Sequence, residues 1–195
     1  MFQLKPPFRP AAKDDAALLA ELVNYAGEGL PLYLWEQMRK DGETAWDVGR
    51  ARASREEGAF SYRNAIVIEH NGKAVGCLIG YEISDDPEPI GPDMPAMFRP
   101  LQKLENLAPG TWYVNVLAVV PETRGMGLGG QMLGVAEEIG RDLNKRGMSV
   151  IVAGNNEGAK RLYLRCGYAP AAERAMVKDG WQSEGDHWAL LIKAF

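Results

Sequence analysis

Residues 119–133 read VVPETRGMGLGGQML, and this stretch decides the fold. The residues before it, 111–120 (TWYVNVLAVV), are β-branched and aromatic, which predicts a strand. The residues after it repeat apolar side chains at helical spacing from Leu128, which predicts a helix to about Arg146. A glycine-rich turn between a strand and a helix presents backbone N–H groups at a helix N-terminus, where the helix dipole favours anions. The stretch therefore predicts a phosphate-binding turn.

Two familiar phosphate-binding patterns fit this turn poorly. A P-loop needs Lys-Ser or Lys-Thr after its last glycine, and none follows here. Gly125, Gly127 and Gly130 match the dinucleotide fingerprint GxGxxG, but residues 121–124 separate them from the strand. The next predicted strand ends in residues 154–156 (GNN), which contain no carboxylate to bind a ribose. Both patterns are therefore disfavoured.

A third pattern, [QR]-x-x-G-x-[GA], is met by Arg124, Gly127 and Gly129. Residues 117–121 (LAVVP) precede it, and residues 156–168 carry a second motif, N-x-x-A-x-x-L-Y-x-x-x-G-Y. With these two motifs in this order, the sequence resembles the GNAT N-acetyltransferase superfamily. The two motifs look like that family's fourth strand with its exit and the helix after its fifth strand.

The order of predicted elements is also that of the family. Strands over 64–69 and 73–83 are joined by Asn71-Gly72, a strong hairpin signal. The resemblance implies one GNAT domain over residues 1–195, an α/β fold whose mixed, mostly antiparallel, twisted sheet has helices on both faces. The long loop Ser84–Gly110, rich in Pro, Asp and Glu, exceeds the usual family length and is expected to act as a lid. Further elements are predicted as helices near 14–26, 30–40, 44–57, 98–107 and 157–165, and as strands over 148–153, 169–178 and 187–193.

Composition excludes several classes of protein. No apolar run reaches about 18 residues, so no membrane-spanning helix is expected. The N-terminal residues lack a basic stretch followed by an apolar one, so no secretory signal is expected. The two cysteines are read as free thiols of the cytoplasm, and with only two histidines no metal site is expected. The net charge of −4 disfavours nucleic acid as a partner and suits a cationic small molecule.

The resemblance implies acetyl-CoA as co-substrate, bound around the turn. Backbone N–H groups from Arg124 to Gly130 would hold its pyrophosphate, with glycines permitting close approach. The residues that the resemblance assigns to acetyl-CoA are Leu117, Ala118 and Val119 on the strand, Arg124, Gly125, Met126, Gly127, Leu128, Gly129 and Gly130 in the turn, and Asn156.

The implied reaction is acetyl transfer from the thioester to a primary amine, most simply that of a small molecule. An alkylammonium with a pKa near 10.4 must lose a proton, which costs roughly 4–5 kcal/mol at pH 7. The departing thiolate needs a proton donor, and Tyr163 is the family match for that acid. Its position on an apolar helix face also fits a core tyrosine.

The base is left open between three residues. Some relatives carry a glutamate on the fourth strand, but residues 111–120 contain no carboxylate. Asn115 could position a water instead, and Glu82, late on the strand before the long loop, is a second candidate. Glu28 lies between two glycines at the break after the first helix, which borders the acceptor pocket in this family.

Two other functions fit the same resemblance. One is a non-catalytic regulator that senses acetyl-CoA, and the other is a protein N-acetyltransferase with an open acceptor groove. Dimers are common in the family, so a second copy of the chain is an expected partner.

Overall fold

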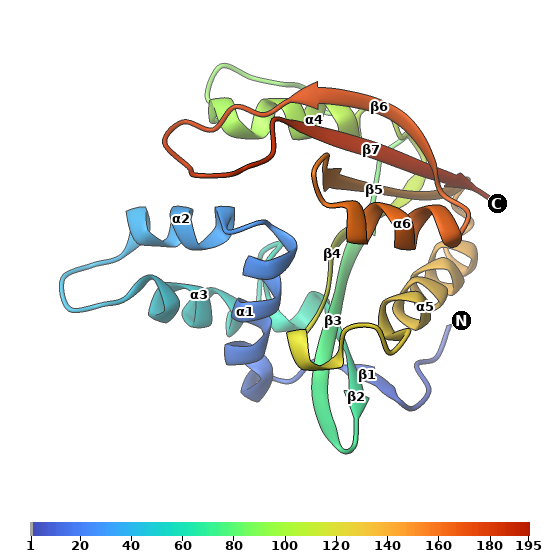
Figure 1. The fold of residues 1–195 in the computed structure, drawn as a ribbon, viewed down its shortest axis with the longest axis horizontal. Helices are drawn as coiled ribbons and strands as arrows, with labels where there is room; N and C mark the ends of the chain where they lie inside the picture. The colour runs from blue at the N-terminus through green and yellow to red at the C-terminus, as the bar shows by residue number, and fades with distance from the viewer. Residues whose placement is uncertain (1) are drawn as a thin grey trace. The chain divides into compact units, whose positions relative to one another are not determined.

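The computed structural model describes residues 2–195, which form seven strands and six α-helices (Figure 1). The strands are β1 (Phe8–Pro10), β2 (Ala65–His70), β3 (Lys73–Glu82), β4 (Thr111–Val119), β5 (Gly147–Ala153), β6 (Ala169–Ala175) and β7 (His187–Ala194). The helices are α1 (Ala16–Ala26), α2 (Leu30–Met38), α3 (Ala45–Ala53), α4 (Arg99–Glu105), α5 (Leu128–Asp142) and α6 (Glu157–Arg165).

The strands form one sheet in the order β1-β2-β3-β4-β5-β7-β6. β4 and β5 run parallel, whereas β1–β2, β2–β3, β5–β7 and β6–β7 are antiparallel pairs. Asn71 and Gly72 turn the β2–β3 hairpin with φ angles of 51° and 73°, as a type I′ turn requires. The predicted fold class, a mixed and mostly antiparallel sheet with helices, is confirmed.

The pairing of β4 with β5 covers only part of each strand. It runs from Thr111 opposite Gly147 to Val114 opposite Val150. β4 continues to Val119 and β5 to Ala153. Past Val114, β4 has backbone groups outside this ladder, and such groups can bond to another extended chain.

The backbone divides into two compact units, which are described separately. The first unit contains residues 3–80 and 116–132. Here α1 and α2 both contact α3. The ring of Trp35 stacks on Phe60 at 5.9 Å and meets Trp46 edge-on at 6.1 Å. The core of this unit also buries aliphatic side chains of α1, β2 and β3, namely Leu19, Leu22, Val67, Cys77 and Ile79.

The second unit contains residues 81–115 and 133–195 together with Phe2. α4 lies against β5, β6 and β7 (Figure 1). Trp181 stacks on Trp188 at 5.9 Å, and both are nearly fully buried. Because the backbone divides into two compact units, the single domain expected over residues 1–195 stays a prediction.

Three elements end three or more residues earlier than the sequence predicts. α5 stops at Asp142 rather than Arg146 because Asn144 has a φ of 54°. The Asn144 N–H then bonds to the Arg141 carbonyl at 3.0 Å, and Lys145 N–H bonds to the Gly140 carbonyl at 2.9 Å. This pair of bonds is a Schellman motif, which closes the helix. α3 and β6 likewise end at Ala53 and Ala175.

The long loop is folded around its own short helix. The predicted helical middle is α4, preceded by a 3-10 turn at Ala96–Phe98. Asn106 ties the loop together, because its Oδ1 accepts from Glu88 N–H at 3.0 Å and its Nδ2 donates to the Glu88 carbonyl at 2.8 Å. Arg99 donates to the Met94 and Pro92 carbonyls. The loop is therefore an ordered structure with internal hydrogen bonds.

Candidate functional site

The glycine-rich turn begins after a short 3-10 helix, Pro121–Thr123, and leads into α5. Gly125 and Gly127 both have a φ of 79°, a conformation that side chains with a Cβ rarely adopt. A Cβ at either position would meet no atom within 4 Å. These glycines are therefore required by backbone conformation, and the space beside them is open to a ligand.

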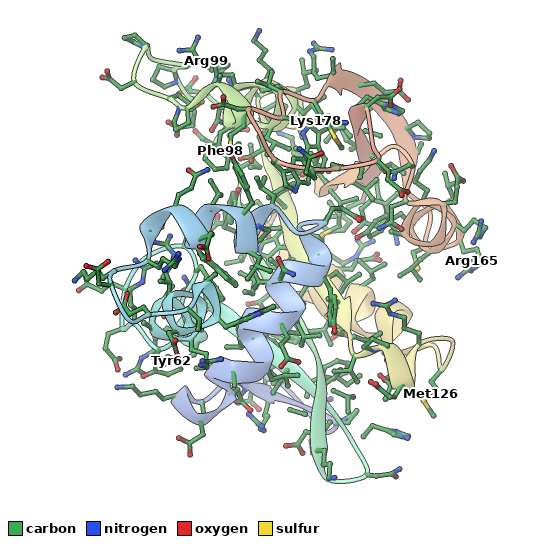
Figure 2. All side chains as sticks on the ribbon, turned by 60° about the vertical axis from the view of Figure 1, so that its left-hand side comes forward. Tyr62, Phe98, Arg99, Met126, Arg165 and Lys178 are labelled. Carbon is green, nitrogen blue, oxygen red and sulfur yellow. The ribbon has the colours of Figure 1, made fainter. Side chains whose placement is uncertain are left out.

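The donors of this turn lie at the start of α5. The Gln131 N–H bonds to the Gly127 carbonyl at 3.2 Å, which closes the first helical turn. The N–H groups of Leu128, Gly129 and Gly130 precede that bond, and helix geometry provides them with no intrahelical acceptor. Met126 is 51% exposed and projects from the turn (Figure 2). The turn can therefore donate several hydrogen bonds to an anion.

Arg124 adds a positive charge to the turn. Its guanidinium carbon lies 5.6 Å from the ring centroid of Tyr25, near the end of α1. A cation over an aromatic face is attracted by the ring quadrupole, which restricts where the guanidinium points. On β4, the side chains of Leu117, Ala118 and Val119 are half-buried.

Tyr163 lies on α6 and is 5% exposed, with its ring 5.6 Å from that of Tyr168. Burial, with a smaller contribution from the neighbouring Cys166, raises the pKa of the Tyr163 phenol. Burial also raises the pKa of Tyr113 well above its usual value. Both phenols are therefore neutral at physiological pH and can donate a hydrogen bond.

Asn156 begins α6 as its N-cap. Its Oδ1 accepts from the Ala159 N–H at 3.0 Å, which satisfies one of the donors at the helix start. A helix cap is thus one observed role of this residue. The contact of Asn156 with acetyl-CoA stays a prediction.

The three candidate bases differ in surroundings. Asn115 is the exposed residue of β4. Glu82 forms an ion pair with Lys145 at 2.5 Å. Glu28 is half-buried between α1 and α2 with a φ of 54°.

The predicted residues fall in both units of the backbone. The first unit holds Glu28, Leu117–Val119 and Arg124–Gly130. The second unit holds Glu82, Asn115, Asn156 and Tyr163. Within the first unit the structure brings the turn and Tyr25 together.

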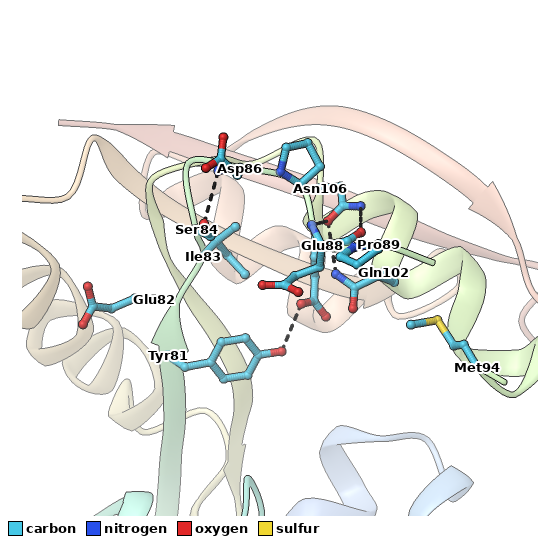
Figure 3. A pocket seen from close by; sticks show the side chains of 12 residues that line it. Tyr81, Glu82, Ile83, Ser84, Asp86, Glu88, Pro89, Met94, Gln102 and Asn106 are labelled. Carbon is cyan, nitrogen blue, oxygen red and sulfur yellow. Dashed lines mark hydrogen bonds between the residues drawn. The ribbon is translucent and has the colours of Figure 1, made fainter. Parts of the chain in front are cut away.

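The second unit also has a cavity of about 450 Å³ that the sequence does not predict. Tyr81 and Glu105 both line it, and the Tyr81 hydroxyl donates to Glu105 Oε2 at 3.2 Å (Figure 3). Figure 3 shows Glu82 pointing away from Tyr81, as alternate residues of a strand do. The sequence signals here were the candidate Glu82 and the loop Ser84–Gly110, rich in Pro, Asp and Glu, which supplies most of the lining.

In residues 2–195, no group of three or more His, Cys, Asp or Glu side chains could hold a metal ion. None of the described helices is both long and apolar enough to cross a membrane.

Comparison with known proteins identifies the family. Residues 32–168 match the family model described as acetyltransferase (GNAT) family. A solved structure described as "The crystal structure of acetyltransferase" has a TM-score of 0.64 at 20% identity, covering 96% of this chain and 98% of that one. An N-acetyltransferase from Staphylococcus aureus Mu50 has a TM-score of 0.63 at 18% identity, covering 95% and 98%.

A GNAT family acetyltransferase from Elizabethkingia anophelis with acetyl-CoA bound has a TM-score of 0.51 at 16% identity, covering 67% of this chain and 75% of that one. No curated protein matches the sequence. The likeness to solved structures shows the fold, and the family model spans well over half of the chain. The chain therefore belongs to the acetyltransferase (GNAT) family, whose co-substrate is acetyl-CoA.

Proposed function

We propose that this acetyltransferase transfers the acetyl group of acetyl-CoA to the primary amine of a small molecule. The observation that carries the proposal is the turn before α5. Gly125 and Gly127 have positive φ angles beside open space, and the first N–H groups of α5 follow directly. This arrangement fits a pyrophosphate, because closely spaced N–H donors at a helix N-terminus favour negative charge.

The turn and the strand would hold different parts of the co-substrate. The backbone N–H groups from Arg124 to Gly130 are assigned to the pyrophosphate, with the Arg124 guanidinium adding charge. The backbone of Leu117–Val119, beyond the β4–β5 ladder, is assigned to the pantetheine arm. Asn156 is assigned to the same region from its place in the second motif.

The acceptor must lose a proton before it attacks the thioester. Glu28, Glu82 and a water positioned by Asn115 remain the proposed routes for that proton. Among them, Glu82 has its carboxylate in an ion pair with Lys145. The amine nitrogen then bonds to the acetyl carbon, and the sulfur departs with the electron pair of the broken C–S bond. The nitrogen loses its second proton to give a neutral amide, and the departed thiolate takes up a proton to become the free thiol of CoA.

Tyr163 is the proposed donor to the departing sulfur. Since burial raises the pKa of its phenol, Tyr163 keeps its proton at neutral pH. A thiol with a pKa of about 8.5 is a stronger acid than a phenol with a pKa of about 10 or more, so full transfer of the proton to the thiolate is uphill. The proposed contribution is therefore a hydrogen bond that stabilises the charge developing on sulfur.

The protein is further proposed to act in the cytoplasm and to form a homodimer. Cys77 and Cys166 are free thiols, which suits the reducing cytoplasm. Burial raises the pKa of Cys77 to about 12, so this thiol is held as an unreactive core group. A homodimer is proposed only because dimers are common in this family.

The test is thiol release from acetyl-CoA against a panel of small primary amines, with matched alcohols as controls. Amine-dependent release of thiol above the rate of hydrolysis is expected. Release that depends only on lysine-containing peptides would replace the small-molecule acceptor with a protein acceptor.

A further inference from the structure

The cavity beside α4 lies in the second unit, and of its lining residues only Glu82 has a role in the proposed function. Its volume, about 450 Å³, is within the usual range for small-molecule sites. It is lined by the end of β3, the start of the long loop and α4 (Figure 3). Part of the cavity wall is apolar and is formed by Ile83, Met94, Pro87 and Pro89. Polar side chains form the rest, so a ligand would find both apolar contacts and hydrogen-bonding groups there.

The charged groups that line this cavity all carry one sign. Four carboxylates line it, from Glu82, Asp86, Glu88 and Glu105, whereas no Lys, Arg or His of residues 2–195 does. Lys145 neutralises Glu82 by its ion pair. Asp86, Glu88 and Glu105 form no ion pair with a basic side chain within residues 2–195. The cavity therefore presents up to three uncompensated negative charges, which attract a ligand of opposite charge.

Glu105 is the carboxylate with the most restricted surroundings. Burial raises its pKa, and the hydrogen bond from Tyr81 opposes that rise only in part. A half-buried carboxylate with a single neutral donor is undersatisfied, because an ionised carboxylate can accept several hydrogen bonds. An ammonium group in the cavity would supply both the missing donors and the missing charge.

Tyr81 lines the cavity and also contacts the buried tyrosine Tyr113. Its ring lies 5.1 Å from that of Tyr113. Tyr113 is 5% exposed, and no described residue forms a hydrogen bond with its hydroxyl. The pKa of Tyr113 is raised by burial and then by the charges of Glu105, Tyr81 and Tyr163. Glu105, Tyr81 and Tyr163 therefore all lie within electrostatic reach of Tyr113, in the second unit.

We propose that this cavity is the acceptor subsite, that it takes an amine bearing at least two positive charges, and that Glu105 binds one of its ammonium groups. The proposal rests on the proposed amine acetyltransferase function and narrows its substrate class. Tyr81 is a positioning residue, because it orients the Glu105 carboxylate through its hydroxyl.

The first test compares three amines that share a four-carbon chain and a reacting amine. They are n-butylamine, 1,4-diaminobutane and 4-aminobutanoate, whose far ends are neutral, cationic and anionic. We expect kcat/KM to be highest for the diamine, by about tenfold over butylamine, as a charge-assisted hydrogen bond provides. The advantage should shrink as salt is added. Equal kcat/KM for the three amines, or a preference for the anionic one, would overturn the proposal.

The second test uses variants of the cavity. Glu105→Gln keeps the shape and removes the charge, and should raise KM for the diamine about tenfold while KM for acetyl-CoA stays within about twofold. Glu105→Asp should recover part of the affinity. Tyr81→Phe should raise KM for the diamine less than Glu105→Gln does. Asp93→Asn is the matched control, because Asp93 is exposed on the same loop and does not line the cavity.

Calorimetric titration of 1,4-diaminobutane separates this proposal from the proposed function. Binding to the wild type that is lost in Glu105→Gln but kept in Asp93→Asn supports the cavity, even if no amine is acetylated. Equal binding to wild type and Glu105→Gln refutes it, even if acetylation is fast. A thermal melt of each variant confirms that the chain is folded.

Discussion

Gly127 combines a φ of 79° with open space on the side where a Cβ would point. Gly127→Val would place a β-branched side chain in that space and force it into the left-handed region, at a cost of about 1–3 kcal/mol. We expect the variant to remain folded and to lose acetyl-CoA affinity, measured by calorimetry.

Gly134→Ala is the control for that variant. Gly134 lies within α5, and a Cβ there would also meet no atom within 4 Å. Since alanine favours a helix over glycine by about 1 kcal/mol, this change should raise stability slightly and leave acetyl-CoA affinity unchanged. Unchanged affinity in a folded Gly127→Val variant would remove the turn from the binding site.

Tyr163→Phe removes one hydroxyl from a residue that is 5% exposed. If the hydroxyl stabilises the departing sulfur, kcat should fall about 10²–10³-fold, the usual range for loss of one hydrogen-bond donor to developing charge, while KM for acetyl-CoA changes little. Since burial raises the Tyr163 pKa above its ordinary value of 10, no loss of activity from its ionisation is expected up to about pH 10. A variant with wild-type turnover would leave Tyr163 as a packing residue only.

At the scale of elements, α3 begins with a capping box between Thr44 and Asp47. Asp47 N–H bonds to Thr44 Oγ1 at 3.2 Å, and Thr44 N–H bonds to Asp47 Oδ2 at 2.8 Å. Thr44→Ala should lower the free energy of unfolding by about 1 kcal/mol, measured in urea. Thr44→Ser, which keeps the hydroxyl, should be close to the wild type.

The same capping box predicts that the free energy of unfolding depends on pH. Hydrogen bonds from Thr44, followed by Arg50, lower the pKa of Asp47 from 3.8 to about 2. Because the folded-state pKa is depressed, the contribution of Asp47 is fully present above about pH 4 and is lost as pH falls through about 2. The difference in unfolding free energy between wild type and Asp47→Asn should shrink over that window. A constant difference from pH 6 to pH 2 would contradict the capping role.

Elements with local signals were predicted well from the sequence. Asn71-Gly72 specified a hairpin because both residues tolerate positive φ, and the structure has them at 51° and 73°. The end of α5 was placed four residues too late, since Asn144 was not read as a left-handed helix stop. Local conformational preference therefore predicts that an element exists more reliably than it predicts the residue at which the element ends.

At the scale of the whole molecule, binding of the co-substrate should appear as stability. A ligand that binds only the folded chain stabilises it by about 2.7 kcal/mol when its concentration is 100 times the dissociation constant. We expect acetyl-CoA to raise the melting temperature, and NAD and ATP to leave it unchanged. A shift with NAD and none with acetyl-CoA would restore the dinucleotide reading of the turn.

The family could be recognised without a structure, because two spaced motifs and the order of strands and helices are properties of the linear chain. The sequence also located the glycine turn, since positive φ angles depend on residue type. The folded structure was needed to show which ionisable groups are buried and which carboxylates form ion pairs. Tyr81 and Glu105 are 24 residues apart, and their contact depends on how β3 and α4 pack. Burial and charge pairing arise from such long-range packing. The acidity of the loop Ser84–Gly110 was therefore visible in the sequence, whereas the cavity that this loop lines was not.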